Sequence, residues 1–167
     1  TISIPQSVTT IGSFAFASCA KLMTLRTPEG VPSIGSFVFH HCKSLNRVEI
    51  HDKVTSIGNG AFHGCASLTN LLLPAKLTSI GNNAFRDCSR LTGLTLPGKL
   101  TTIGREGFRG CSGLTSLSIP DSVTTIADHA FAECAGLTQV RLSNIVTSIG
   151  SFAFSGCRQL KELAIPE

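Results

Sequence analysis

Residues 11–19 read IGSFAFASC, and residues 149–157 read IGSFAFSGC, which differs from the first stretch at two positions. Between them the same pattern returns every 23 residues. The interval is clearest for cysteine, at Cys19, Cys42, Cys65, Cys88, Cys111, Cys134 and Cys157. Columns of isoleucine, phenylalanine and leucine, which begin at Ile11, Phe16 and Leu22, keep the same step. The sequence therefore predicts seven copies of one structural unit.

One unit can be interpreted from residues 114–136, LTSLSIPDSVTTIADHAFAECAG. Leu117 and Ile119 alternate with serines, which is the periodicity of a β-strand. Pro120 has no N–H to donate to a neighbouring strand, so the strand ends there. Val123 and Ile126 follow with the spacing of a second extended segment. Each unit is thus expected to contain a strand and an extended return.

A glycine follows the second extended segment in six of the seven units: Gly12, Gly35, Gly58, Gly81, Gly104 and Gly150. Glycine suits a positive φ or a close approach of two backbones. The next column holds Ser, Asn or Asp in six of seven units, and these residues are good helix N-caps. The pattern predicts a short helical turn that carries Ala, Phe and Cys. Because one unit cannot bury its apolar side alone, the copies must stack into a solenoid.

The consensus LxxLxLPxxVTxIGxxAFxxC resembles the BspA-like, or treponemal-type, leucine-rich repeat over the whole chain. The resemblance implies a leucine-rich repeat solenoid of seven 23-residue repeats, curved, with a parallel β-sheet on its concave face and short helical turns on its convex side. We expect residues 1–167 to form a single array and, since no capping repeat is visible, to be a fragment of a longer one. Thr27 in a leucine column, and His51 and Ser143 in the proline column, depart from the pattern.

The composition excludes several classes of protein. Apolar residues make up 42% and charged residues 14%, so the chain can bury a core and is not disordered. No apolar run is long enough for membrane insertion. A net charge of +4 is too mild to indicate nucleic-acid binding. No P-loop, nucleophile elbow or dinucleotide fingerprint is present, so we expect no enzymatic activity and no cofactor.

The resemblance also implies a function and a location. Family members are typically surface-exposed or secreted proteins linked to adhesion, which implies an extracellular or cell-surface ligand-binding module. We expect a host or matrix protein, or an acidic glycan, bound by weak multivalent contacts. The alternative is a structural subunit that self-assembles end to end into a filament. Eight strand segments are expected, and the terminal ones, from TISI at residues 1–4 to LAIP at residues 163–166, are apolar and uncapped.

Candidate binding residues follow from the columns. Large or charged side chains on the expected concave face are Arg26, Arg47, Glu49, Leu72 and Arg141, among mostly small polar residues. A second set, Lys53, Lys76 and Lys99, lies one repeat apart and predicts either an anion-binding rim or a solubilising one, with Glu29, Asp52 and Asp121 in the adjacent column.

Three phenylalanines lie outside the core column, at Phe14, Phe37 and Phe152. They are candidates for self-association, and the alternative is local packing against the neighbouring turn.

The cysteines and histidines are the residues that could suggest chemistry. The cysteine column is predicted to be a buried ladder of free, unreactive thiols. His40 and His63 share a column that continues with Arg86 and Arg109, and we interpret it as a solvated basic face without a metal site. His41 is expected to point away from His40, because adjacent residues on a helical turn diverge.

Overall fold

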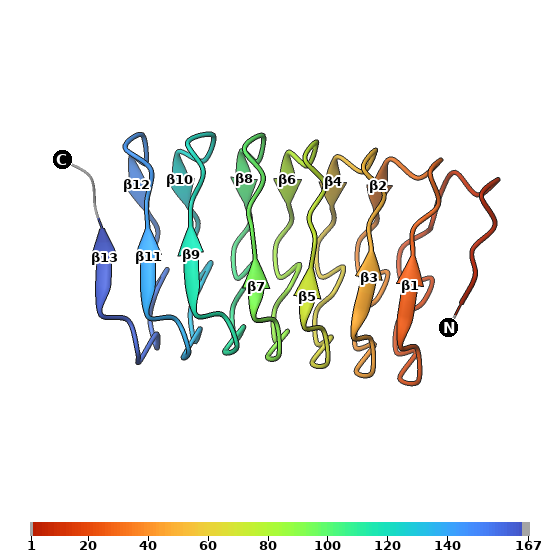
Figure 1. Cartoon of the computed structure of the whole chain (residues 1–167), viewed down its shortest axis with the longest axis horizontal. Coiled ribbons are helices and arrows are strands. Elements are labelled where there is room, and N and C mark those ends of the chain that lie inside the picture. The colour runs from red at the N-terminus through yellow and green to blue at the C-terminus, as the bar shows by residue number, and fades with distance from the viewer. Residues whose placement is uncertain (1, 165–167) are drawn as a thin grey trace.

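The computed structural model describes residues 2–164, which wind into a solenoid of parallel strands (Figure 1). One row holds the odd-numbered strands: β1 Thr24–Arg26, β3 Arg47–Glu49, β5 Asn70–Leu71, β7 Gly93–Leu94, β9 Ser116–Ser118, β11 Gln139–Arg141 and β13 Glu162–Ala164. The other row holds the even-numbered strands: β2 Ser33–Ile34, β4 Ser56–Ile57, β6 Ser79–Ile80, β8 Thr102–Ile103, β10 Thr125–Ile126 and β12 Ser148–Ile149. The predicted leucine-rich repeat solenoid with parallel sheets is confirmed.

The strands pair in a register of one repeat. Thr24 lies opposite Arg47, and Ser33 opposite Ser56, a shift of 23 residues in each row. The rows are interrupted at one place. The odd strands form a sheet β1-β3-β5-β7 and a sheet β13-β11-β9, and the even strands form β2-β4-β6-β8 and β10-β12. Strand β7 does not pair with β9, and β8 does not pair with β10. Both breaks therefore fall between the fourth and fifth turns of the solenoid, which residues 104–115 connect.

Short helical turns, expected after each even strand, are absent from residues 2–164, which contain no helix. In the second copy, the N–H of His40 donates to the carbonyl of Phe37, three residues back, at 3.2 Å. The N–H groups of Phe37 and His41 donate instead to the next copy, to Asn59 at 2.8 Å and to His63 at 2.7 Å. Because alternate N–H groups point to the neighbouring copy, they cannot close the i→i−4 bonds of an α-helix.

Two columns of these turns have positive φ in every copy. The first contains Phe14, Phe37, Gly60, Asn83, Glu106, His129 and Phe152, and the second contains Ser18, His41, Gly64, Asp87, Gly110, Glu133 and Gly156. The left-handed residues reverse the chain twice within each turn, so alternate N–H groups face the next copy. These two columns, rather than the glycine column after the even strands, meet the demand for left-handed backbone.

The glycine column serves a close backbone approach. A Cβ added at Gly104 would lie 2.5 Å from the backbone nitrogen of Asn82, and one at Gly58 would lie 2.8 Å from the carbonyl carbon of Gly35. None of these glycines has a positive φ. At Gly12, in the first copy, an added Cβ would meet nothing within 4 Å. Of the two roles expected for this column, the structure thus shows the close approach.

The predicted N-cap column forms a ladder between copies. The Oδ1 atom of Asn59 accepts from the N–H of Asn82 at 2.8 Å, and Oδ1 of Asn82 accepts from the N–H of Arg105 at 2.9 Å. Asp128 and Ser151 repeat the contact at 2.7 Å. These side chains cap the next copy of the turn rather than their own, because no helix follows them.

The core is made of aligned ladders. Rings of the phenylalanine column stack with centroids 5.1–5.6 Å apart, from Phe16 to Phe154. The cysteine column lies beside it, and the five internal cysteines are completely buried. Each of these thiols donates to the backbone carbonyl of the core phenylalanine one copy earlier, as Cys65 does to Phe39 at 3.2 Å. All seven cysteines are free, as predicted.

The first copy differs from the others. Its residues 2–11 form no strand, although TISI at residues 1–4 was expected to begin a strand. Strand β1 is therefore the edge of its sheet among the described residues and pairs with β3 alone. The described chain therefore has six turns in which an odd strand is followed by an even one, followed by β13, rather than seven complete repeats. The last expected strand, LAIP at residues 163–166, is seen as far as Ala164, and residues 165–166 lie outside the described residues.

Candidate functional site

Side chains that point to solvent from the odd strands form what we call the odd-strand surface. Arg26 and Glu49 are partners in the register of β1 and β3, with Nε and Oε2 3.9 Å apart. Arg47 contacts the same carboxylate, with Nη2 2.9 Å from Oε1. Leu72 follows β5 directly, one repeat after Glu49, and is 87% exposed. The structure thus brings four of the five predicted concave-face residues together.

Arg141 does not belong to this group. It lies in β11, in the column of Arg26 but five copies away, and it pairs in register with Ser118 and Ala164. At about 4.8 Å per strand, five copies correspond to roughly 24 Å. One compact ligand cannot contact both arginines, although an extended one can.

An open hollow of about 490 Å³ lies beside the odd-strand surface, lined by Gln6, Arg26, Glu29, Gly30 and His51. It lies beside Thr27 and includes His51, which depart from the repeat consensus in two adjacent copies. The lining is mostly polar and charged, and neither Gln6 nor Glu29 was predicted to be a binding residue. The sequence feature that points to this hollow is that two departures from the consensus, Thr27 and His51, occur in adjacent copies.

The three rim lysines are all exposed but differ in their partners. The Nζ atom of Lys53 lies 2.7 Å from Oε1 of Glu29. This hydrogen bond lowers the pKa of the Glu29 carboxyl and raises the pKa of the Lys53 ammonium. Lys76 and Lys99 make no ion pair within residues 2–164. The residue that corresponds to Glu29, 24 positions earlier, is Ala75 for Lys99 and Asp52 for Lys76, and Asp52 instead lies 3.0 Å from Nδ1 of His51. A positive rim is therefore left at two of the three predicted positions.

The three candidate phenylalanines have different environments. Phe37 is half-buried, stacked on Phe14 with centroids 4.8 Å apart, and its ring covers Gly60, where an added Cβ would lie 2.3 Å from it. Phe14 is 56% exposed and Phe152 is 65% exposed. Phe152 stacks on His129 at 5.0 Å. Local packing thus accounts for Phe37, whereas Phe14 and Phe152 offer apolar surface near the two ends of the array.

The buried thiols are poor candidates for chemistry. Burial raises the pKa of Cys42 to about 11 and that of Cys134 to about 12, and it raises the pKa values of Cys65, Cys88 and Cys111 further. A thiol reacts as its thiolate, so these groups are protonated and inaccessible at neutral pH.

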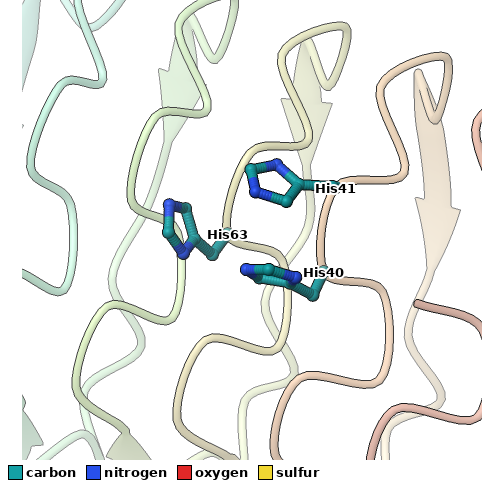
Figure 2. Close-up of side chains that lie close together, drawn as sticks. All are labelled: His40, His41 and His63. Atoms are coloured by element: carbon teal, nitrogen blue, oxygen red, sulfur yellow. The ribbon is translucent and has the colours of Figure 1, made fainter. Parts of the chain in front are cut away.

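Three histidines meet on the turn side of the second and third copies (Figure 2). The ring centroids are 4.1 Å apart for His40 and His41, 4.9 Å for His40 and His63, and 5.2 Å for His41 and His63. The expectation that His41 points away from His40 is therefore wrong. It assumed helical geometry, whereas His41 has φ 56° and its side chain turns back over the neighbouring copy.

The arginines in the same column as His40 and His63 are neutralised. Arg86 places Nη1 2.6 Å from Oε2 of Glu106, and Arg109 places Nη2 2.7 Å from Oε1 of Glu133. The side chain of Glu106 is only 14% exposed and also lies 3.4 Å from Arg109. The carboxylates come from the two positive-φ columns. The predicted basic face is therefore a charge-balanced ladder at these positions.

Comparison with known proteins agrees with this architecture. A family model described as a BspA type leucine rich repeat region matches in six copies, over residues 1–115 and 78–167. The chain belongs to the BspA-type leucine-rich repeat family. The predicted family is confirmed, and these repeat proteins are typically binding proteins rather than enzymes.

The chain resembles several solved structures of leucine-rich repeat proteins. A leucine-rich repeat protein of T. pallidum is 32% identical with a TM-score of 0.86, and the match covers 91% of this chain and 71% of that one. A leucine-rich repeat protein of Bacteroides ovatus is 33% identical with a TM-score of 0.73, over 92% of this chain and 48% of that one. The chain thus spans about half the length of the second relative.

A third structure is named a leucine rich cell surface protein, from Faecalibacterium prausnitzii, with 23% identity and a TM-score of 0.50, over 88% of this chain and 60% of that one. At this identity the likeness shows the fold alone. No curated protein matches the chain. Residues 2–164 include no helix with the length and apolarity needed to cross a membrane.

Proposed function

We propose that this chain is a non-enzymatic binding module of a surface or secreted adhesion-type protein, and that its partner contacts the odd-strand surface around Leu72. The observation that supports the proposal is the exposure of that leucine. It is 87% exposed in a column where Glu49 precedes it and Thr95 follows. Internal packing does not account for a leucine in this position, whereas a partner that covers it would remove its apolar surface from water.

The surroundings of Leu72 suit a weak contact with a protein. Arg26 and Arg47 both contact Glu49, the residue one repeat before Leu72. Arginine is one of the residues that contribute most at interfaces. Tyrosine and tryptophan, the other such residues, do not occur in the sequence. The seven odd strands extend over roughly 30 Å, so several contacts can act together. A host or matrix protein with an extended surface fits this arrangement.

A surface or secreted location is part of the proposal. It is supported by the family and by the cell-surface name of one structural relative.

The test compares Leu72→Thr with the unchanged chain on an array of immobilised extracellular-matrix proteins. Threonine already stands at position 95 in the same column, so the substitution should leave the fold intact. We expect binding to fall about tenfold or more, since loss of an interface anchor costs upward of about 1–2 kcal/mol. Ile145→Thr is the control, because Ile145 is also an exposed apolar residue but lies in the lysine column. Equal binding by Leu72→Thr and the parent chain would move the site elsewhere.

An acidic glycan is the second ligand class that we propose, at Lys76 and Lys99. Heparin serves as the probe in a binding assay over a range of salt concentrations, because exposed charge contacts weaken with screening. The double variant Lys76→Gln, Lys99→Gln should weaken heparin binding more than Lys53→Gln, since Lys53 already pairs with Glu29. If Lys53→Gln has the larger effect, the two unpaired lysines are not the anion site.

End-to-end self-assembly is the alternative function. A mostly apolar hollow of about 370 Å³, lined by Ile2, Cys19, Ala20, Lys21 and Leu22, lies in the first copy and exposes the edge of the core. Phe16, Cys157 and Leu160, the outermost described members of their ladders, are likewise only partly buried. Such a head-to-tail contact does not close, so it would build a filament.

Light scattering over a concentration series, with electron microscopy of the same samples, separates the two functions. Linear particles that shorten in the variant Phe14→Ser, Phe152→Ser would support assembly. A monomer at every concentration would exclude it and leave the binding module.

A further inference from the structure

The backbone holds the three histidines in fixed positions. His41 donates its N–H to the carbonyl of His63 at 2.7 Å, which joins the two turns that carry the cluster. The N–H of His40 donates to Phe37 at 3.2 Å, and the N–H of His63 donates to Gly60 at 3.1 Å. All three backbone amides are therefore satisfied, and only the imidazole rings are left to adjust. A site supported in this way loses little freedom when a ligand arrives.

Two glycines make room for the arrangement. A Cβ on Gly64 would lie 2.3 Å from Nδ1 of His41, so the absence of a side chain lets this ring lie over the third copy. Gly60 does the same for Phe37, whose ring packs edge-on against His40 at 5.7 Å. The rings of His40 and His41 are thereby directed toward His63.

One ligand nitrogen from each ring can be chosen so that all three lie within 4.8 Å of one another. We propose that His40, His41 and His63 bind a divalent transition-metal cation that prefers imidazole nitrogen, with Zn²⁺ as the representative ion and water in the fourth position. Zinc binds histidine nitrogen at about 2.0–2.1 Å in a tetrahedron, which places ligand nitrogens roughly 3.4 Å apart. Rotation of the three imidazoles about their side-chain bonds would close the remaining gap.

The charges around the cluster favour a cation. Asp87 places Oδ2 3.4 Å from Nε2 of His63, and a carboxylate beside a ligating histidine raises the affinity of a metal site. Arg86, whose positive charge acts on His63, is engaged by Glu106 at 2.6 Å and by Asp87 at 3.4 Å. Burial lowers the pKa values of His40 and His63, which favours the neutral rings that a metal requires.

The donor set also selects the kind of ion. Three imidazoles offer nitrogen only, whereas Ca²⁺ and Mg²⁺ take oxygen ligands. Among the late first-row ions, Cu²⁺ binds such donors more tightly than Ni²⁺ or Zn²⁺. We therefore expect the chain to bind Cu²⁺ more tightly than Ni²⁺ or Zn²⁺, and not to bind Ca²⁺.

Isothermal titration of the full chain, without an affinity tag, with ZnCl₂ provides the test. We expect one ion per chain and a rise in the melting temperature on addition of the ion, because the ion binds the folded state. The variant His41→Asn should lose affinity by at least the roughly 10–100-fold that loss of an outer-shell partner costs. The variant Asp87→Asn, which removes such an outer-shell partner, should lower the affinity for Zn²⁺ by roughly 10–100-fold.

The matched control is His129→Asn. His41 and His129 both have positive φ, at 56° and 54°, and Asn83 shows that asparagine accepts this backbone. The control therefore repeats the chemical change away from the cluster and should bind Zn²⁺ like the unchanged chain. Unaltered zinc binding by His41→Asn, or equal losses in both variants, would overturn the proposal.

A second measurement does not depend on variants. The paramagnetic resonance spectrum of the chain with one equivalent of Cu²⁺ should show hyperfine coupling to several imidazole nitrogens. A spectrum with oxygen ligands only, or titrations without uptake of Cu²⁺, Ni²⁺ or Zn²⁺, would refute the site.

Discussion

The hydroxyl of Thr27 accepts a hydrogen bond from the backbone N–H of His51, with 2.8 Å between the two atoms. Thr27 is 1% exposed in a column of leucine and isoleucine, and His51 stands where most copies have proline. Proline has no N–H, so the usual copy needs no acceptor here. The histidine introduces a donor, and the threonine one copy earlier satisfies it. Two departures from the repeat consensus therefore compensate each other.

The first prediction concerns this pair. Thr27→Val keeps the shape of the side chain but leaves the N–H of His51 without its acceptor, so the free energy of unfolding should fall by about 1–3 kcal/mol. Adding His51→Pro removes the donor and should restore most of the loss. Chemical denaturation of the two single variants and the double variant measures the coupling. Additive effects in this cycle would contradict the compensation.

The glycine column allows a comparison within one repeat position. Gly104→Ala should destabilise the fold by about 1–3 kcal/mol, because its Cβ would lie 2.5 Å from the backbone of the preceding copy. Gly12→Ala, where nothing lies within 4 Å, should change stability by less than about 0.5 kcal/mol. Thermal denaturation of both variants checks this. Similar losses would mean that close approach is not what selects glycine in this column.

Left-handed backbone gives the third prediction. Ser18 is exposed and has φ 59°, and Gly64, Gly110 and Gly156 occupy its column in other copies. Ser18→Gly relieves a conformation that costs an L-residue roughly 1–2 kcal/mol, less the entropy that glycine adds to the unfolded chain. We expect a net gain of about 0.5 kcal/mol.

The control for Ser18→Gly is Ser116→Gly in β9, an exposed serine whose φ is not positive. Since only the entropic cost applies there, it should lose about 0.5–1 kcal/mol. If the midpoints of denaturation of the two variants shift in the same direction, the backbone of Ser18 is not strained.

The cysteine ladder predicts a loss of stability in alkali. Burial raises the pKa of the Cys88 and Cys111 thiols above the value of the unfolded chain. The unfolded state therefore ionises first, so the stabilisation is complete below the ordinary thiol pKa and declines as pH rises through it. Between about pH 7.5 and about pH 9.5 each buried cysteine should lower the free energy of unfolding by about 1 kcal/mol. The sequence has no tyrosine to obscure the effect.

Urea denaturation at several pH values measures this dependence. Cys88→Ala should be less stable at neutral pH, because it leaves a cavity, but its stability should fall less steeply with pH. A slope equal to that of the parent chain would show that the thiols do not cause the alkaline loss.

Most of the fold follows from the sequence because a fixed period leaves few arrangements open. The 23-residue step predicts the parallel register, and the columns of Phe16 and Cys19 predict the core ladders. The period does not report the backbone within a turn. Helical turns were predicted from N-cap residues and the spacing of Ala, Phe and Cys, but a mixed column of Gly, Asp and Ser at Gly64, Asp87 and Ser18 is a signal for positive φ.

The histidine cluster was missed for the same reason. His40 and His63 were recognised as neighbours from the period alone. Whether His41 joins them depends on its φ and on the absence of a side chain at Gly64, and neither follows from treating the turn as helical. The odd-strand surface needed no such detail, since alternation along a strand decides which of its side chains face solvent.

Both rows of strands break at the same level, yet the turns do not. Phe85 donates its N–H to Gly107, and Phe108 donates to Ala130, so the hydrogen-bonded turns continue past the gap between β7 and β9. In mechanical terms we infer two stiff plates joined by a hinge, which consists of these turns, the hydrogen bond from the Ser122 hydroxyl to the Leu100 carbonyl and the stacked phenylalanine column. Bending should concentrate at that hinge and splay the odd strands on either side. A long partner laid across them would then meet an adjustable angle between the plates rather than a rigid rod.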